Sequence, residues 1–278
     1  MIVINVNSQL GNQMFQYALY RKLLYKGNTV KLDLRYFDKK PNHFGLDIFK
    51  LQLDVASNKE IAKSRDENRT FVDRFRRKYF GKQSLIFEEI TSSTLKYKPE
   101  IFNLKKGYID GYWQSEKYFF DIKSILLSDF KFPKPEDDKN KSLLIKIRNT
   151  ISVSIHVRRG DYIGGFPLMS VKYYQKAIQY FEKKYNNLFF VVFSNDMEWS
   201  RKNIKIKHGE YVDWNTGEKS YVDMYLMTQC KHNIIANSSF SWWGAWLNQN
   251  NQKEVIAPFE WLYHQETPDV YCANWIII

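Results

Sequence analysis

A regular alternation of apolar, β-branched runs with helix-periodic segments constrains the fold of this chain more than any other feature. Residues 2–6 (IVINV) form a short apolar run, and the turn-like sequence NSQLGN follows at 7–12. Apolar residues then recur at helical spacing from Gln13 to Tyr25, and a second strand-like run, NTVKLDL, covers 28–34. A strand, a helix and a strand in succession predict parallel pairing through a right-handed crossover.

The same alternation returns after residue 150 and continues almost to the C-terminus. It predicts strands at 151–157, 188–194, 232–237 and 254–258, and helices at 171–185, 220–228 and 239–250. These lengths and spacings are those of successive β-α units. We therefore expect an α/β protein with a second parallel sheet in its C-terminal half.

The pattern is weaker between these two regions. Residues 40–110 are irregular and suggest short helices, whereas 115–127 predicts one further helix. The sequence KFPKPEDDKNKS at 131–142 combines two prolines with dense mixed charge, which is typical of a linker or of a helix start. We place a domain boundary there, which gives an N-terminal domain of residues 1–140 and a C-terminal domain of residues 141–278.

The composition favours an anionic partner without identifying it. The chain has 42 Lys and Arg against 30 Asp and Glu, for a net charge of +12, and 17% of its residues are aromatic. Such an excess attracts nucleic acid, a membrane surface or phosphorylated small molecules, and aromatic rings stack on sugars or bases. A lysine-rich solvated surface produces the same charge, so charge alone leaves these classes open.

Residues 69–82 (RTFVDRFRRKYFGK) concentrate this charge. They hold six basic residues and one acidic residue, interleaved with Phe71, Phe75, Tyr79 and Phe80. A basic helix with an aromatic face can lie on an anionic membrane. It can equally be an amphipathic helix that packs on its own domain, which is the more common arrangement.

The compartment is expected to be reducing and cytoplasmic. Cys230 and Cys272 are the only cysteines, so no disulfide framework is indicated. The N-terminal sequence reads as a strand rather than as a signal peptide, and no apolar run approaches the roughly 18 residues of a membrane span.

Small and polar residues follow four of the predicted strands. The segments are NSQLGNQ, HVRRGDY, SNDMEW and ANSSFSWWG. Ligands of open parallel sheets bind just beyond the carboxyl ends of strands, and helix starts offer free N–H groups to an anion. Serine and asparagine are also ordinary N-cap residues, so each segment alone is weak evidence. Their coincidence at four strand ends predicts a ligand site.

Arg158 and Arg159 directly follow the predicted strand 151–157, with Gly160 and Asp161 behind them. Adjacent residues leaving a strand point in opposite directions, so one arginine can face a ligand while the other braces the structure. Arginine binds phosphate oxygens through bidentate, charge-assisted hydrogen bonds. Alternatively, Asp161 pairs with an arginine to fix the turn at Gly160, and the two interpretations are compatible. The Arg-Gly-Asp tripeptide also spells an integrin-binding motif, which does not suit a cysteine-poor chain without a secretion signal.

Several familiar motifs are absent from the sequence. The chain has no P-loop, no G-x-G-x-x-G, no H-E-x-x-H and no G-x-S-x-G. It also lacks D-x-D, the carboxylate pair that usually holds a metal ion on a nucleotide diphosphate. A departing diphosphate would then need cationic side chains and helix N-termini to stabilise its charge.

Four motifs, in this order and spacing, resemble the α-1,2-fucosyltransferases of glycosyltransferase family 11. They are LGNQMFQYA, HVRRGDY, FSND and ANSSFSWWGAWLN, and the likeness extends to NWI near the C-terminus. The resemblance implies a GT-B fold, with two Rossmann-like domains facing each other across a cleft. It also implies inverting transfer of L-fucose from GDP-β-L-fucose to the 2-hydroxyl of a terminal β-galactoside, without a metal ion or other cofactor. The C-terminal domain would hold GDP-fucose and the N-terminal domain the acceptor.

The same resemblance assigns roles to residues. Arg158 would contact the leaving diphosphate, His156 and Asp223 would recognise guanine, and Asn12 would reach the donor from the N-terminal domain. Asp161 is expected to be essential and, with Arg159, to hold the turn, although pairing with arginine makes a carboxylate a poor base. The catalytic group is thus Arg158, Asp161 and Asn12. The other expected donor-binding residues are Gly11, Gln13, Arg159, Ser194, Asn195, Asp196, Asn237, Ser238, Ser239 and Phe240.

One departure from the family pattern concerns the N-terminal motif. Family members often begin with G-G-L-G-N-Q, whereas this chain has NSQLGNQ, with Asn7 and Ser8 in place of glycines. The turn around Gly11 is therefore expected to differ in detail.

Two wider interpretations follow. The first is a cytoplasmic enzyme of surface-glycan synthesis, such as O-antigen or capsule, whose lipid-linked acceptor brings residues 69–82 against the inner membrane. The rival is a non-catalytic nucleic-acid-binding protein that uses the positive charge and the exposed aromatic residues. Between the two lies an enzyme that keeps the sugar-nucleotide site but transfers another sugar or forms another linkage.

Overall fold

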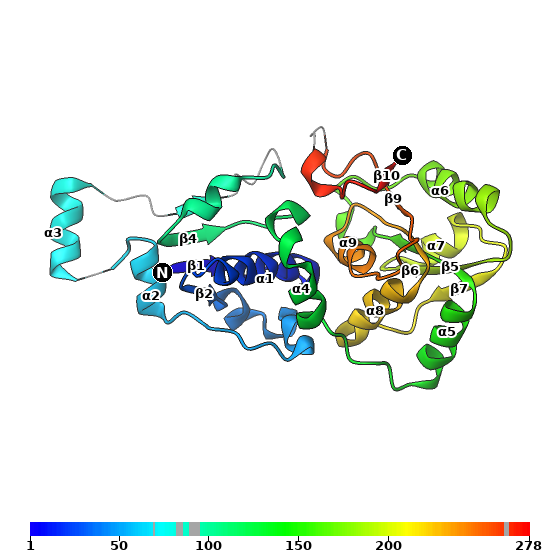
Figure 1. The fold of residues 1–278 in the computed structure, drawn as a ribbon, viewed down its shortest axis with the longest axis horizontal. Helices are drawn as coiled ribbons and strands as arrows, with labels where there is room; N and C mark the ends of the chain where they lie inside the picture. The colour runs from blue at the N-terminus through cyan, green and yellow to red at the C-terminus, as the bar shows by residue number, and fades with distance from the viewer. Residues whose placement is uncertain (69, 82–85, 89–94, 264–266) are drawn as a thin grey trace. The chain divides into compact units, whose positions relative to one another are not determined.

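The computed structural model describes residues 1–278 except 69, 82–85, 89–94 and 264–266. The chain forms two compact units, one of residues 1–131 with 268–270 and one of residues 132–267 with 271–278. The break after Lys131 precedes the boundary expected at 140/141, because the helix at 138–149 packs in the second unit. Each unit contains its own parallel sheet (Figure 1).

The first unit is built on a four-stranded sheet with the strand order β2-β1-β4-β3. All three pairings are parallel, and Ile2 lies opposite both Val30 and Gly107. The strands are β1 (Ile2–Asn5), β2 (Val30–Asp33), β3 (Ile86–Glu88) and β4 (Gly107–Asp110), and the α-helices are α1 (Leu10–Tyr25), α2 (Asn58–Ser64), α3 (Phe71–Phe80) and α4 (Lys123–Asp129).

The helix predicted over 115–127 is wrong in its details. Residues 116–118 and 120–122 form two short 3-10 turns before α4 begins at Lys123. The interruption falls at Phe119, whose φ of −147° is not helical. Its ring packs 6.0 Å from that of Phe15 in α1, so a core contact overrides the local helical pattern.

The second unit is built on a six-stranded, all-parallel sheet with the order β10-β9-β8-β5-β6-β7. The predicted strands at 151–157 and 188–194 are confirmed with their bounds. The strands are β5 (Ile151–Val157), β6 (Leu188–Ser194), β7 (Gly209–Val212), β8 (His232–Ile234), β9 (Val255–Ala257) and β10 (Ile276–Ile277). The α-helices are α5 (Asp138–Asn149), α6 (Val171–Lys184), α7 (Met197–Asn203), α8 (Tyr221–Gln229) and α9 (Ser239–Trp246).

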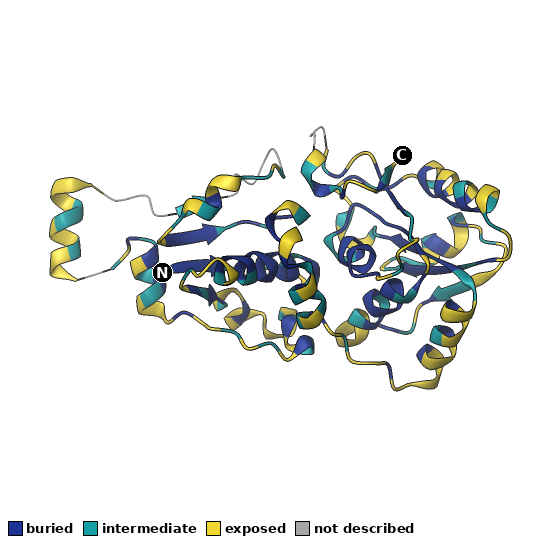
Figure 2. Ribbon diagram, viewed as in Figure 1, coloured by how far each residue is buried: buried dark blue, intermediate teal, exposed yellow. Residues whose placement is uncertain are grey.

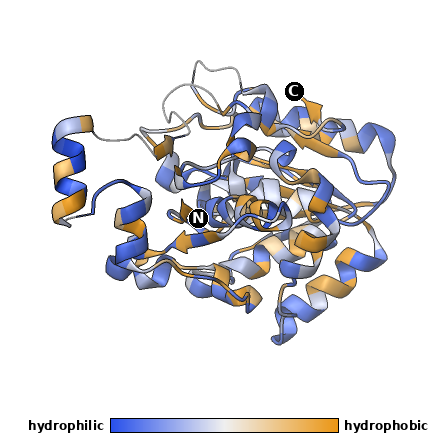
Figure 3. Ribbon diagram, turned by 60° about the vertical axis from the view of Figure 1, so that its left-hand side comes forward, coloured by the Kyte–Doolittle hydropathy of each residue, from blue (hydrophilic) through white to orange (hydrophobic). Residues whose placement is uncertain are grey.

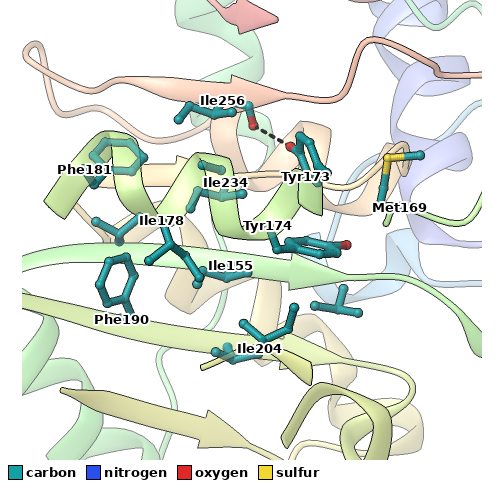
Figure 4. Packing of buried hydrophobic residues seen from close by; sticks show 14 of the residues in the cluster. Ile155, Met169, Tyr173, Tyr174, Ile178, Phe181, Phe190, Ile204, Ile234 and Ile256 are labelled. Atoms are coloured by element: carbon teal, nitrogen blue, oxygen red, sulfur yellow. Dashed lines mark hydrogen bonds between the residues drawn. The ribbon is translucent and has the colours of Figure 1, made fainter. Parts of the chain in front are cut away.

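Strand β5 lies in the middle of this sheet and is buried on both faces. Val153, Ile155 and Val157 point into one hydrophobic cluster, which Tyr174 and Phe181 of α6 complete (Figure 4). On the opposite face, Ser154 Oγ accepts a hydrogen bond from Asn233 Nδ2 at 2.7 Å. Successive side chains of β5 thus alternate between the hydrophobic cluster and a polar face, and the same alternation carries His156 to the polar face at the end of the strand.

Candidate active site

The strand order places one switch point in each sheet. In the second unit, the chain proceeds from β5 to β6 and β7 on one side, then returns to β8 and β9 on the other. Neighbouring connections therefore diverge between β5 and β8, and ligands of open α/β sheets bind beyond the carboxyl ends of such strands. The motifs HVRRGDY and ANSSF leave the sheet at this point.

Arg158 is held by a carboxylate directly beyond β5. Its Nη2 donates to Asp161 Oδ2 at 2.6 Å, and the other carboxylate oxygen accepts from Asn195 Nδ2 at 2.8 Å. The guanidinium also lies 5.5 Å from the centre of the Tyr162 ring. Asp161 is thus held by Asn195, the residue that follows β6, and it fixes the direction of the Arg158 side chain.

Arg159 is directed elsewhere. Its guanidinium lies 4.0 Å from the centre of the Trp199 ring, and its Nε is 3.6 Å from Asp196 Oδ2. Arg159 and Asp161, which we expected to hold the turn, therefore make separate contacts there, and both reach Asn195. The adjacent arginines diverge as strand geometry requires, and it is Arg158 that pairs with Asp161.

The SNDMEW segment contains three residues that we expected to bind the sugar donor, Ser194, Asn195 and Asp196. In the structure their side chains hydrogen bond to the backbone of this turn and of the residues that follow β6. Asn195 Oδ1 accepts from the backbone N–H of Arg159 at 2.8 Å. Asp196 caps α7 by accepting from the backbone N–H of Trp199 at 3.1 Å, and Ser194 Oγ accepts from the backbone N–H of Asp196 at 2.9 Å. All three side chains therefore have bracing roles within the second unit.

His156 is buried beneath the same strand end. Its ring lies 5.6 Å from that of Phe240, which belongs to the first turn of α9. Burial, followed by the positive charge of Arg158, lowers the pKa of His156 to about 3. The imidazole is thus neutral at physiological pH, and its buried Nδ1 has no hydrogen-bond partner among the described residues.

The start of α9 adjoins Arg158 through Tyr162. The Tyr162 hydroxyl donates to the carbonyl of Asn237 at 3.1 Å, immediately before α9. Ser238 is the N-cap residue, its side chain makes no cap hydrogen bond, and the first turn contains no acidic residue. The N–H groups of an α-helix's first turn have no partner within the helix, so this end favours an anion.

Asn237 has a structural role at the same strand end. It is 3% exposed, and its Nδ2 donates to the carbonyls of Pro167 and Trp261 at 3.0 and 3.2 Å. These bonds connect the loop after β8 to two other loops of the unit. Ser239 and Phe240 keep partial exposure and form the accessible part of the motif.

Asp223, an expected guanine contact, lies in the first turn of α8. Its surroundings include Asn215, Asn140 and Trp214, which the sequence did not indicate as site residues. Its Oδ1 accepts from Asn215 Nδ2 at 2.8 Å, and Asn215 in turn exchanges hydrogen bonds with Asn140 of α5 at 2.7 and 3.0 Å. Trp214 Nε1 donates to Asn140 Oδ1 at 3.0 Å. Desolvation raises the pKa of Asp223 to about 8, so the carboxyl is largely protonated at neutral pH.

The N-terminal motif occupies the corresponding switch point of the first sheet, beyond β1 and β4. Ser8 and Trp113 follow these strands with φ values of +66° and +57°, a conformation that is uncommon for residues other than glycine. Asn12 Oδ1 accepts from Gln114 Nε2 at 2.8 Å, and Gly11 is buried in the first turn of α1.

Gln13 is fully buried in this turn. Its Nε2 donates to the carbonyls of Ser8 and His43, and its Oε1 accepts from the backbone N–H of Gly45. Both amide hydrogens and the carbonyl oxygen are thus engaged within the unit. We therefore assign Gln13 to shaping the turn instead of contacting the donor.

The edge of the first sheet also contains a carboxylate that the sequence analysis missed. Asp110 ends β4, is half-buried, and accepts a hydrogen bond from Asn5 Nδ2 at 2.9 Å. Asp33, at the end of β2, is buried and is fully engaged by Arg35 and Tyr108. A single aspartate at the end of a four-residue strand carries no distinctive sequence signal.

Comparison with known proteins identifies the family that carries these motifs. A model of glycosyl transferase family 11 matches residues 1–278. The chain belongs to glycosyltransferase family 11. The enzyme interpretation is thereby confirmed over the nucleic-acid-binding rival.

Three relatives illustrate the range of this family. The chain is 37% identical to an alpha-1,2-colitosyltransferase of Escherichia coli, over 95% of this chain and 93% of that protein. It is 32% identical to the O-antigen biosynthesis glycosyltransferase WbnK of Escherichia coli, over 96% and 97% of the two chains. It is also 38% identical to galactoside alpha-(1,2)-fucosyltransferase 2 of Gorilla gorilla gorilla, over 34% of this chain and 30% of that protein.

A solved structure confirms the expected fold. Fucosyltransferase NodZ from Bradyrhizobium superposes with a TM-score of 0.50 and 14% sequence identity, over 87% of this chain and 90% of that chain. The family 11 chain thus has the GT-B fold, with one parallel α/β sheet in each unit.

Proposed function

We propose that this enzyme transfers L-fucose from GDP-β-L-fucose to the 2-hydroxyl of a terminal β-galactoside, with inversion and without a metal ion. The observation that carries the proposal is the position of Arg158, which is held by Asp161 beside His156, Tyr162 and the start of α9. A fixed guanidinium next to a helix N-terminus is suited to a diphosphate leaving group.

In the proposed reaction, the acceptor oxygen attacks the anomeric carbon of fucose from the face opposite GDP. The bond between that carbon and the β-phosphate oxygen breaks, the electron pair leaves with GDP, and the proton of the acceptor hydroxyl is released. Negative charge therefore grows on the β-phosphate as the bond breaks. Arg158 and the first-turn N–H groups of α9 would stabilise this charge more in the transition state than in the ground state.

We assign recognition of the nucleoside to His156, Phe240 and Asp223. The neutral imidazole and the Phe240 ring give an uncharged aromatic surface that suits the nucleoside end of the donor better than its phosphates. An ionised Asp223 would accept the N1–H and 2-amino hydrogens of guanine, while Asn215 orients the carboxyl. These assignments give the second unit the donor-binding role.

The acceptor is assigned to the first unit. The switch point beyond β1 and β4 combines polar side chains, two residues with strained backbone and the half-buried carboxylate of Asp110. Asn12, at this switch point, would also reach the donor. The relation to WbnK supports a role in O-antigen or other surface-glycan synthesis, with a lipid-linked acceptor at the cytoplasmic side.

Colitose is a second candidate for the transferred sugar. The 37% identity to an alpha-1,2-colitosyltransferase over nearly the whole chain favours it, and the linkage would be the same. Colitose is fucose without its 3-hydroxyl group, so a site that hydrogen bonds this hydroxyl would discriminate strongly between the two donors.

We expect transfer to proceed undiminished in excess EDTA, because the charges assigned to the leaving group belong to Arg158 and the start of α9. The measurement incubates the enzyme with either GDP-fucose or GDP-colitose and a β-galactoside, and determines the linkage of the product by NMR. A parallel reaction contains Mg²⁺ in place of EDTA. Loss of transfer in EDTA with recovery in Mg²⁺ would contradict the metal-independent mechanism. Transfer from GDP-colitose but not from GDP-fucose would show that the transferred sugar is colitose.

A further inference from the structure

Helix α3 presents an apolar face that the rest of the described chain does not cover. Five of its ten residues are large apolar side chains that remain exposed, with Phe71 83% and Phe75 52% accessible. The other three are Val72, Tyr79 and Phe80. Figure 2 shows α3 with exposed and intermediate residues only, and none of its residues is buried.

The helical repeat gathers most of these side chains on one side. At about 100° per residue, Phe71, Phe75, Tyr79 and Val72 fall within an arc of roughly 100°. The rings of Phe75 and Tyr79 are already in contact, with centroids 4.4 Å apart. The apolar face, defined by these four residues, therefore exists before any partner binds.

Arginines on the opposite side tether the helix. Arg76 and Arg77 both reach the buried carboxylate of Asp66, and Arg77 also donates to the carbonyls of Asp66 and Asn68. These two arginines are centred about half a turn away from the apolar face. The tether thus fixes α3 with its apolar face turned away from the loop that holds it. Among the described residues, the apolar face therefore does not pack on its own domain, which is the more common arrangement.

Exposed cations border the apolar face. Arg74 and Lys78 are exposed and flank Phe71 and Phe75 on one side, and the Lys78 ammonium lies 5.6 Å from the centre of the Tyr79 ring. Figure 3 shows hydrophobic and hydrophilic residues together on this helix. Aromatic residues bordered by cations are the pattern of helices that lie in a membrane interface.

We propose that α3 docks this enzyme on an anionic lipid bilayer, with the apolar face in the headgroup region and Arg74 and Lys78 on lipid phosphates. Charge complementarity favours this occupant over a second copy of the chain, because pairing two α3 helices would bring their cations together. One ten-residue helix face is also small beside the roughly 800 Å² that each partner buries in a stable interface. The residues that the structure describes include no helix that meets the length and hydropathy of a membrane span, and the proposal concerns a surface contact only.

The test measures binding of the full chain to vesicles by sedimentation. Vesicles of phosphatidylcholine with about 30% phosphatidylglycerol are compared with vesicles of phosphatidylcholine alone. The charge variant is Arg74→Glu with Lys78→Glu, and its matched control is Lys172→Glu with Lys176→Glu on exposed positions of α6. The apolar variant is Phe71→Ser with Phe75→Ser, and its control is Phe259→Ser, at another exposed phenylalanine.

We expect binding to anionic vesicles to fall at least about tenfold in the charge variant and in the apolar variant, and to change little in both controls. Equal loss in the Lys172/Lys176 control would show a diffuse charge effect and would overturn the assignment to α3. If the protein instead forms a dimer that Phe71→Ser with Phe75→Ser disrupts, while vesicle binding is unchanged, the apolar face binds a second copy of the chain and the proposal is overturned. Fucosyl transfer to a water-soluble galactoside is expected to be the same in all five proteins, so failure of the proposed function would appear there and not in the vesicle assay.

Discussion

Replacing Arg158 by alanine is expected to lower fucosyl transfer by about 10²–10³-fold while the protein remains folded. The side chain is only partly exposed, yet it lies beyond the carboxyl end of β5 and leaves the hydrophobic cluster of that strand intact. Its removal leaves the growing charge on the β-phosphate to the start of α9 alone. The effect should fall on kcat, because the lost contact strengthens as the bond to the phosphate breaks.

The control for this variant is Arg201→Ala. Arg201 donates to Asp213 at 2.7 Å in the same unit, and both side chains are half exposed. An exposed ion pair of this kind contributes at most about 1 kcal/mol to stability. Equal loss of transfer in the Arg158 and Arg201 variants, or full activity of Arg158→Ala, would show that Arg158 has no specific role in the reaction.

Asp161 can be placed by the same measurements. If Asp161 acts by orienting Arg158, Asp161→Asn should lower kcat less than Arg158→Ala, and adding it to Arg158→Ala should have little further effect. Independent, multiplicative losses would instead give Asp161 a role of its own. The geometry favours coupling, because Asp161 reaches both Arg158 and Asn195 with separate oxygens.

Much of the second unit could be predicted from the sequence because local patterns agree with the packing there. Strand β5 alternates Val153, Ile155 and Val157 with Ser154 and His156. The structure packs the first set against α6, whereas Ser154 contacts Asn233 of β8 and His156 lies beside Phe240 of α9. The end of β5 can also be predicted from the sequence, because a buried strand cannot continue through Arg158 and Arg159 unless their charges have partners. The position of the phosphate-binding candidate follows from that end.

Shorter elements escaped the sequence analysis for a physical reason. Strands β4 and β7 each begin at a glycine, Gly107 and Gly209, and glycine is depleted in strands, so the local pattern does not favour a strand at either place. Gly209 permits close approach of β6, since a Cβ at this position would lie 2.0 Å from the Phe190 carbonyl oxygen. Such a constraint depends on a neighbouring strand and leaves no mark in the local pattern.

The pairing of charged and polar side chains could not be predicted either. Arg158 meets Asp161 because residues 160–162 form a 3-10 turn, whereas Arg159 finds Trp199 and Asp196 more than 35 residues later. The amides that position Asp223 come from Asn215 and, beyond it, from Asn140, 75 residues earlier than Asn215. Only the fold brings these groups together.

Asp223→Asn is expected to stabilise the free protein while weakening GDP binding. The folded-state pKa of Asp223 is about 8, above the ordinary value near 4, so the folded chain keeps a proton between these values that the unfolded chain loses. Its contribution to the free energy of unfolding therefore falls as the pH rises from about 4 to 8. Asparagine keeps the acceptor for Asn215 Nδ2 and cannot ionise, so this pH-dependent loss disappears.

Thermal unfolding across this pH range tests the stability half of the prediction. The melting temperature of Asp223→Asn should equal that of the parent near pH 4 and exceed it by at least about 2–4 °C at pH 8, the shift that 1 kcal/mol produces in a chain of this size. Asp213→Asn, at an exposed aspartate of the same unit, is the control and should show no such divergence. Parallel curves for parent and variant would mean that Asp223 is not desolvated in the free protein.

Calorimetry tests the binding half. Guanine offers two hydrogens to an ionised Asp223, whereas asparagine accepts with one atom only, so GDP affinity should fall about 10–100-fold in the variant. Because the carboxyl is largely protonated in the free protein at pH 7, GDP binding to the parent should also release a proton, and the measured enthalpy should depend on the ionisation enthalpy of the buffer. Both effects should vanish for a nucleotide without guanine, such as ADP. If the variant is stabilised but binds GDP with unchanged affinity, and the parent releases no proton on binding, Asp223 has a structural role only. Other residues would then recognise guanine.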